Sequence, residues 1–389
     1  MIDNIGVNVL KQPVGMLSNE NEKFIFTYTH TRDFVSLTMP PRTQQYINNK
    51  LHPIFEMNLP EGYLLSIIKK HFSKIVKTDE FGILKLISKG IKGRITYNST
   101  EDNPENSLEL NDLLNPQSTN LFEELVSKFA LNSAISGVQP KVLANIRNKA
   151  TLKYDNYIVK SWGGEYPELA LNEYYCMLLA KYANIPVPEF YISSDAKLFI
   201  MKRFDILENG EILGFEDMCV LQAKQSDEKY DGSYESIAKS IKTFVSPKYK
   251  KRSLKDFFKI IVINNILQNG DAHLKNFGLV YENIENIKLA PAYDIVSTTF
   301  YIKNDILALN LLGSKKWWDK KYILRFGMES CELTKHEATL LYNECINASK
   351  KVLTAIQNNM IKEKNEDKKR LLKHLNNLLE KTLDLSQGF

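Results

Sequence analysis

Two patterns of apolar and polar residues divide the chain. Up to about residue 205, short runs rich in β-branched and aromatic residues are mixed with single helical stretches, as in Lys23–Thr29 and Glu168–Tyr182. From about residue 216 onwards, apolar residues recur at helical spacing, as in Phe257–Leu267. The sequence therefore predicts an α+β protein with a mixed α/β N-terminal lobe and a mainly α-helical C-terminal lobe.

The same patterns predict the individual elements. Strands are expected at residues 23–29, 34–39, 141–144, 157–160, 190–192 and 198–201, with a small hairpin at 279–281 and 287–289. Helices are expected at residues 63–75, 121–129, 168–182, 257–267, 335–362 and 367–383. The polar, proline-containing stretch 99–106 is the best linker candidate. We therefore expect an N-terminal α/β subdomain at 1–100, the core of the N-terminal lobe at 118–205, and a helical lobe at 206–389.

The composition is that of an ordinary soluble globular protein, with 43% hydrophobic and 25% charged residues. A length of 389 residues is enough for two or three packed lobes. The net charge of +5 is small for this length, so it favours a solvated lysine-rich surface over direct nucleic-acid binding.

The cysteines and the N-terminal residues indicate in which cellular compartment the protein is expected. The four cysteines are Cys176, Cys219, Cys331 and Cys345. They form no C-x-x-C pair and no zinc-ligand spacing, and they are interpreted as reduced thiols. The N-terminus lacks the pattern of a signal peptide, and the apolar run near Ile260 is too short to span a membrane. We expect a cytoplasmic protein without membrane contact.

Asp271 and Asn276 are the first candidates for chemistry. Phosphoryl transfer needs a carboxylate near the incoming hydroxyl and oxygen ligands for Mg²⁺, and protein kinases supply both from a loop with Asp-x-x-x-x-Asn spacing. Asp271 and Asn276 have this spacing, and Asp294 follows the predicted hairpin where a kinase has its metal-binding aspartate. In the alternative interpretation, Asn-Gly-Asp is a common turn and Asp271 caps the helix that begins after it.

Three upstream features fit a bound nucleotide. The small residues of Ser133–Lys141 permit close backbone approach to phosphates, although they could form a simple tight turn. Lys160 closes a predicted strand where a kinase has its phosphate-binding lysine, or it reaches out to solvent. Glu173 in the next helix could orient Lys160 by an ion pair, or it is simply solvated.

The segment Met201–Asp205 follows a predicted strand at the position of a kinase hinge. Backbone groups there would bind adenine, and Asp205 could accept from the ribose hydroxyls. In the alternative, Asp205 forms a salt bridge with Arg203 or Lys202. The order of these features along the chain is that of a phosphotransferase that holds ATP and Mg²⁺ between two lobes.

With these motifs the sequence resembles the HipA family, the serine/threonine-kinase toxins of bacterial toxin–antitoxin pairs, over nearly the whole chain. The similar segments are 55–62, 136–141, 171–176, 202–205, 215–219, 269–277 and 291–294. The resemblance implies a two-lobed fold like that of protein kinases. It also implies Asp271 as the catalytic residue, with Asn276 and Asp294 as Mg²⁺ ligands.

The resemblance also implies a nucleotide site. Lys160 would bind the ATP phosphates, backbone groups of Lys202 and Phe204 would hold adenine, and Asp205 would hold the ribose. The further expected nucleotide-binding residues are Ser136, Gly137, Val138, Gln139, Lys141 and His273.

Members of the family phosphorylate a serine of their own phosphate loop, which ejects the loop and silences the kinase. This sequence has Ala134 at the usual position, so Ser136, or else Ser133, is the candidate for self-phosphorylation. Pro140 stands where many members have an acidic residue, which predicts a stiffer loop.

The expected function is phosphorylation of a serine or threonine of a protein such as an aminoacyl-tRNA synthetase, with arrest of translation and persistence as the result. The resemblance implies a helix-turn-helix antitoxin of the HipB type as partner, with DNA bound only through it. Two alternatives remain open: a small-molecule or lipid kinase, and a non-catalytic corepressor. The intact set of Asp271, Asn276 and Asp294 argues against the corepressor.

Overall fold

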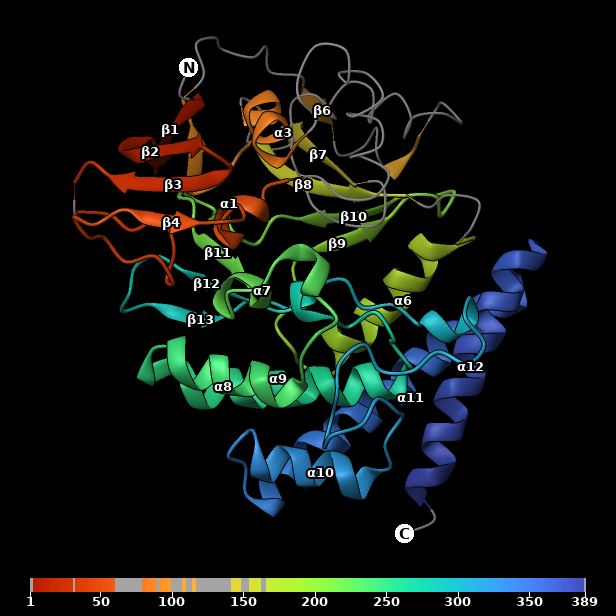
Figure 1. Cartoon of the computed structure of the whole chain (residues 1–389). Helices are drawn as coiled ribbons and strands as arrows, with labels where there is room; N and C mark the ends of the chain where they lie inside the picture. Colours follow the sequence, from red (N-terminus) through yellow and green to blue (C-terminus); the bar gives the residue numbers. More distant parts are fainter. Residues whose placement is uncertain are drawn as a thin grey trace. The chain divides into compact units, whose positions relative to one another are not determined.

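The computed structural model describes residues 3–30, 32–59, 79–88, 91–98, 107–109, 114–116, 141–147, 154–161 and 166–387 (Figure 1). The chain divides into two compact units. The first comprises residues 1–161, 193–228 and 280–284. The second comprises residues 162–192, 229–279 and 285–389.

An antiparallel sheet with the order β4-β3-β2-β1-β5 begins the first unit. Its strands are β1 (Asp3–Val9), β2 (Gln12–Glu20), β3 (Lys23–Tyr28), β4 (Tyr46–Asn48) and β5 (Ile95–Tyr97). Two helices, α1 (Pro53–Glu56) and α3 (Glu80–Ile87), pack against it through aromatic rings. Phe26 contacts Phe55 with ring centroids 5.4 Å apart, and Phe24 contacts Phe81 at 6.2 Å. Burial of these apolar side chains fixes the helices on the sheet.

A second sheet in the first unit contains, side by side, β6 (Ser107–Glu109), β7 (Lys141–Arg147), β8 (Tyr154–Lys160) and β10 (Phe199–Lys202). Strand β6 is parallel to β7, and the other pairs are antiparallel. Lys160 lies opposite Lys141 on one neighbouring strand and opposite Phe199 on the other. This sheet therefore places Lys160 on a central strand.

The buried carboxylate of Glu216 ties the N-terminal residues into the first unit. Glu216 lies on β11 (Gly214–Asp217) and is fully buried. Its carboxylate accepts hydrogen bonds from the Ser36 hydroxyl at 2.7 Å, the Leu37 N–H at 2.8 Å and the Tyr281 hydroxyl at 2.7 Å. The predicted strand at 34–39 is wrong, because the polar groups of this segment satisfy a carboxylate instead of a neighbouring strand.

The second unit is mainly helical. Its helices are α6 (Leu169–Tyr182), α8 (Tyr234–Phe244), α9 (Pro247–Ile266), α10 (Lys320–Glu329), α11 (Lys335–Lys362) and α12 (Glu366–Gln387). Helix α11 packs against α6, α9, α10 and α12 (Figure 1). The short strands β9 (Phe190–Ile192) and β13 (Ile287–Leu289) also belong to this unit, and β12 (Gly278–Tyr281) begins in it.

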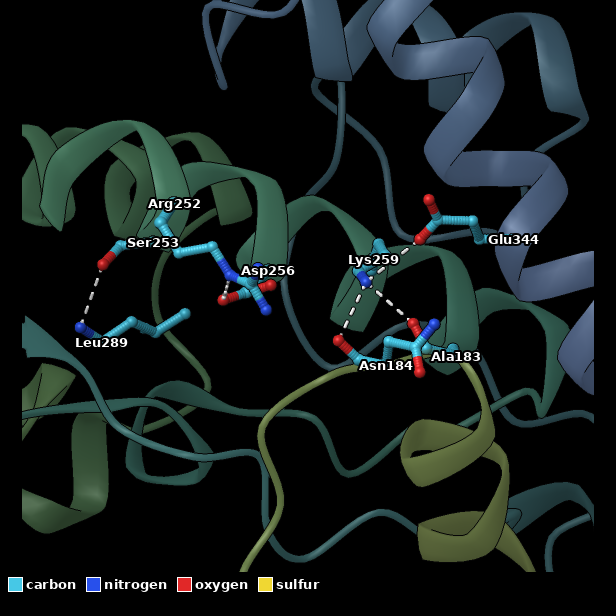
Figure 2. A network of polar contacts seen from close by, with 8 residues as sticks. All are labelled: Ala183, Asn184, Arg252, Ser253, Asp256, Lys259, Leu289 and Glu344. Carbon is cyan, nitrogen blue, oxygen red and sulfur yellow. Dashed lines mark hydrogen bonds and ion pairs between the residues drawn. The ribbon is translucent and has the colours of Figure 1, made fainter.

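A buried lysine joins three of these helices. Lys259 of α9 is 3% exposed, and its ammonium group donates to the carbonyls of Ala183 at 2.7 Å and Asn184 at 3.1 Å (Figure 2). It also forms an ion pair with Glu344 of α11 at 3.3 Å. Ala183 is the C-cap of α6, so the cation satisfies a helix end whose carbonyls carry partial negative charge.

Most predicted elements within the described residues are confirmed with small shifts. Helix α9 begins ten residues earlier than predicted, at Pro247, a residue suited to the first helical turn. Strands β1 and β2 and helices α8 and α10 were not predicted. The helices predicted at 63–75 and 121–129 and the linker at 99–106 lie outside the described residues.

None of the four cysteines forms a disulfide, and all four are buried, as expected for reduced thiols. Burial raises the pKa of the Cys176 thiol above its usual range. Among the described residues, we find no helix with the length and apolar character needed to cross a lipid bilayer.

Candidate active site

The loop between α9 and β12 carries the predicted catalytic residues. Asn269 anchors its first half: the side-chain amide donates to Asn264 Oδ1 at 2.9 Å, and its own Oδ1 accepts from the Asp271 N–H at 3.1 Å. Asn269 is 1% exposed, so this pair is shielded from water. The backbone before Asp271 is therefore fixed to the end of α9.

Asp271 does not cap the helix that follows it. The short helix Leu274–Asn276 has His273 at its N-cap and no side-chain cap bond, so the capping interpretation is wrong. The Asp271 side chain is 41% exposed, and its Oδ1 accepts from the Tyr230 hydroxyl at 2.7 Å. His273 Nε2 lies 3.8 Å from the same oxygen. A carboxylate that is partly open to solvent and held on one side is suited to contact with a substrate.

Asn276 closes the loop. Its side-chain Nδ2 donates to the backbone carbonyl of Asp271 at 2.6 Å. Because the amide nitrogen makes this bond, the remaining amide atom, Oδ1, is the one that could coordinate a hard cation. The Asp-x-x-x-x-Asn spacing thus brings the two side chains to the same small loop.

Asp294 has an uncommon backbone conformation. Its φ is 58°, in the left-handed region that few residues other than glycine adopt. The preceding Tyr293 donates from its hydroxyl to the carbonyl of Lys275 at 2.9 Å, which ties this segment to the catalytic loop. Such conformations persist where surrounding contacts enforce them and are frequent at active sites. A carboxylate here and the Asn276 amide oxygen are the donor types that Mg²⁺ prefers.

The residues after Asp294 are held from two sides. Asn172 of α6 accepts from the Ser297 N–H and donates to the Ser297 carbonyl, both at 2.9 Å. The hydroxyl of Thr298 accepts from the Gly270 N–H at 2.8 Å and donates to the Gln268 carbonyl at 3.1 Å. The segment that carries Asp294 is therefore connected both to α6 and to the catalytic loop.

Lys160 and Glu173 are buried charged residues. Lys160 lies in the first unit and is 3% exposed, with its Nζ 5.9 Å from the centroid of the Phe199 ring. Glu173 lies in the second unit and is 1% exposed. The interpretations of both as solvated side chains are therefore wrong. Charged side chains are buried in this way where an interaction compensates the loss of water.

The predicted hinge contains an ion pair. Arg203, which is 8% exposed, donates from Nε to Asp205 Oδ1 at 2.8 Å and from Nη2 to Oδ2. This is the salt bridge that was the alternative interpretation of Asp205. The backbone carbonyl of Asp205 accepts from the Leu213 N–H at 2.8 Å, and the Phe204 ring packs edge-on against Phe215.

The predicted residues are divided between the two units. Asp271, His273, Asn276 and Asp294 lie in the second unit, and Lys141, Lys160, Lys202, Phe204 and Asp205 lie in the first. The loop residues Ser133, Ser136, Gly137, Val138 and Gln139, together with Ala134 and Pro140, lie outside the described residues.

Several residues that contact the catalytic loop could not be found from the sequence, among them Tyr230 and Thr298. Tyr230 precedes α8 and reaches Asp271, and Thr298 reaches Gly270. Neither stands in a spacing that signals chemistry, since a lone tyrosine or threonine in a loop has many ordinary roles. The Asn172 side chain belongs to a recognised motif, but its contact with Ser297 could not be predicted.

Comparison with known proteins identifies the family of this chain. Residues 133–359, more than half of the chain, match the model of the HipA-like C-terminal domain, and residues 5–98 match the HipA N-terminal domain. A protein of Sinorhizobium fredii that is named as a kinase, Y4dM, is 26% identical over 349 residues, 80% of this chain and 81% of its own length. A protein of Haemophilus influenzae, also named as a kinase, is 31% identical over 203 residues, 47% of this chain and 59% of its own length.

The fold is also similar to that of a solved structure. The complex of HipA, HipB and operator DNA from Shewanella oneidensis superposes with a TM-score of 0.73, covering 99% of this chain and 97% of that chain at 19% identity. The predicted α+β fold of the HipA type is thereby confirmed. On the two domain matches, this chain belongs to the HipA family.

Proposed function

We propose that this protein is an ATP- and Mg²⁺-dependent kinase that transfers phosphate to serine or threonine residues of another protein. The observation that carries the proposal is the loop Asn269–Asn276, in which the Asp271 carboxylate is partly open to solvent and the Asn276 side chain is bonded to the Asp271 backbone. This is the pairing of acceptor-orienting and metal-binding groups that phosphoryl transfer requires.

Each residue has a part in this proposal. Asp271 would orient the acceptor hydroxyl and take its proton, while Asn276 Oδ1 and the Asp294 carboxylate would hold Mg²⁺. When bound, ATP would supply the phosphoryl group, and Mg²⁺ would neutralise the negative charge of the phosphates. The buried ammonium group of Lys160 would bind ATP phosphates, because a desolvated cation attracts anions more strongly than one in water.

The nucleoside would be held by the hinge. Backbone groups of Lys202 and Phe204 would bind adenine, and Asp205 would accept from ribose hydroxyls while it remains paired with Arg203. This sharing is feasible because an ionised carboxylate has about four acceptor positions. Ser136, or else Ser133, would be the residue on which the kinase modifies itself.

The wider proposal is that the kinase is the toxin of a type II toxin–antitoxin system. It is supported by membership of the HipA family and by the similarity to a HipA that was solved with HipB and operator DNA. A helix-turn-helix antitoxin would be its partner, and DNA would be bound through that partner. A translation component such as an aminoacyl-tRNA synthetase would be its target.

The test is phosphoproteomics after induction of the wild-type protein and of Asp271→Asn in bacterial cells. We expect phosphoserine or phosphothreonine on one or a few proteins, dependent on Asp271, together with growth arrest. Phosphate appearing only in metabolites or lipids would replace the protein-kinase proposal with that of a small-molecule kinase. Equal growth arrest by Asp271→Asn, without new phosphorylation, would favour a non-catalytic role.

A further inference from the structure

The hydroxyl of Tyr230 contacts the catalytic carboxylate directly. The 2.7 Å hydrogen bond to Asp271 Oδ1 has the usual length for a hydroxyl donor and an oxygen acceptor. Tyr230 is 39% exposed, so burial of its ring alone does not explain its position. Two functions are conceivable for such a contact: blocking the carboxylate against substrate, or holding it in a working orientation.

The surroundings of Tyr230 favour the second function. The Leu274 N–H in the catalytic loop donates to the Lys229 carbonyl at 3.1 Å. Lys315 donates from Nζ to the Tyr230 carbonyl at 3.3 Å. The Tyr230 ring also meets the ring of the buried His273 edge-on, with centroids 5.0 Å apart. The backbone next to Tyr230 and the Tyr230 ring are thus both bound to the loop that carries Asp271. A residue that blocks the substrate would have to move away from Asp271, and these contacts oppose such a movement.

Because a carboxylate is a rigid planar group, the contact of Tyr230 with one oxygen of Asp271 also affects the other oxygen. The two oxygens rotate together about the Cβ–Cγ bond, which is only weakly restricted by itself. A hydrogen bond that holds Oδ1 therefore also sets the direction in which Oδ2 points. Misplacement of a catalytic group by about 1 Å can lower the rate about a hundredfold.

We propose that Tyr230 is a positioning residue for phosphoryl transfer: its hydroxyl holds Oδ1 of Asp271 so that Oδ2 is presented to the acceptor hydroxyl. This inference rests on the proposed function. It assigns to Tyr230 an effect on the rate of transfer and none on the binding of ATP.

The test is transfer of ³²P from [γ-³²P]ATP to the total protein of a bacterial lysate, measured over a range of ATP concentrations. Tyr230→Phe removes the hydroxyl and keeps the ring against His273. We expect its maximal rate to fall about tenfold, the effect of losing one charge-assisted hydrogen bond, with the KM for ATP unchanged. p-Aminophenylalanine at position 230 retains a donor at this place and should restore most of the rate.

The matched control is Tyr182→Phe. Tyr182 is equally exposed, at 38%, and its hydroxyl makes no hydrogen bond to the described part of the chain. This variant should transfer phosphate at the wild-type rate. Thermal unfolding of all variants establishes that they are folded.

Two results would overturn the inference. If Tyr230→Phe transferred phosphate at the wild-type rate, Tyr230 would contribute only through packing of its ring. If the variant were faster than the wild type, the Tyr230 hydroxyl would hinder access of the substrate to Asp271. Failure of the proposed function would give a different result. If Asp271→Asn kept the wild-type rate, Asp271 would not be the catalytic residue. Loss of activity in Asp271→Asn together with a normal Tyr230→Phe overturns only the role of Tyr230.

Discussion

Thr298 and Gly270 are joined by a hydrogen bond of 2.8 Å between the threonine hydroxyl and the glycine N–H. Gly270 directly precedes Asp271, and Thr298 closely follows Asp294. The same hydroxyl donates to the carbonyl of Gln268 at 3.1 Å. A single side chain thus connects the segment of the proposed catalytic residue with the segment of the proposed metal ligand.

Replacement of Thr298 by valine should separate these segments. Valine has the same shape but removes the acceptor of the Gly270 N–H and leaves the Gln268 carbonyl with only the backbone N–H of residue 298, at 3.3 Å. We expect a loss of about 1–2 kcal/mol in the free energy of unfolding in urea and a phosphoryl transfer rate at least about tenfold lower. Thr298→Ser keeps the hydroxyl and should stay near the wild type. Equal behaviour of the valine and serine variants would show that the hydroxyl has no such role.

Gly270→Ala should damage the catalytic loop for a steric reason. A Cβ at this position would lie 2.0 Å from Asp305 Oδ2 and 2.7 Å from the Ile306 carbonyl oxygen. The carboxylate can rotate away, but the backbone oxygen cannot, so the loop must shift at a cost of about 1–3 kcal/mol. Thermal unfolding should show this loss, and phosphate transfer should fall sharply.

The control for that variant is Gly232→Ala, where the nearest atoms to an added Cβ are 3.6 Å away, an ordinary contact. It should unfold within a few tenths of a kcal/mol of the wild type. If both alanine variants behaved alike, the crowding at Gly270 would not be what constrains the loop.

Lys259→Met should loosen α6 from α9 and α11. The substitution leaves the carbonyls of Ala183 and Asn184 without their donor and removes the partner of Glu344. We expect a loss of about 2–4 kcal/mol in the free energy of unfolding, since a buried network loses its central cation. Lys350→Met, on the exposed face of α11, should cost less than about 0.5 kcal/mol. Urea unfolding of the two variants provides the comparison.

Glu216 should make stability depend on pH. Burial raises the pKa of its carboxyl above the usual range, against the smaller lowering effects of its three hydrogen-bond donors. The folded state therefore holds this proton more tightly than the unfolded chain. The resulting stabilisation is present below the ordinary pKa of about 4.5 and is lost as the pH rises through the raised folded value.

The measurement is the free energy of unfolding of the wild type and of Glu216→Gln across that pH range. The glutamine variant does not titrate, so its stability should fall less steeply with rising pH. Glu211→Gln, an exposed site, is the control and should follow the wild type. Parallel curves for the wild type and Glu216→Gln would contradict the assigned shift.

The sequence predicts local features of this protein better than distant contacts. The spacing of Asp271 and Asn276 within one loop, and the helix that carries Glu173, follow from short-range patterns. The role of residues 34–39 does not, because it depends on a carboxylate at Glu216 far along the chain. Strand periodicity alone could not reveal that partner.

The same limit applies to the candidate site. Tyr230 and Thr298 contact the catalytic loop only after the chain has folded back on itself, and a single hydroxyl leaves no periodic signal. For Lys160 and for Asp205, the sequence alone leaves two interpretations of the side chain open. For Lys160 the sequence permits either a phosphate-binding role or a side chain in solvent, and for Asp205 either a ribose-binding role or a salt bridge. The structure buries Lys160 and pairs Asp205 with Arg203.

The most direct test of the central proposal compares purified wild-type protein with Asp271→Asn in transfer of ³²P from [γ-³²P]ATP to lysate proteins, with Mg²⁺ and with excess EDTA. The proposal predicts labelled phosphoserine or phosphothreonine with the wild type, its loss in EDTA, and a rate at least about a hundredfold lower for Asp271→Asn with ATP binding retained. Undiminished transfer by Asp271→Asn, or transfer that persists in EDTA, would contradict it.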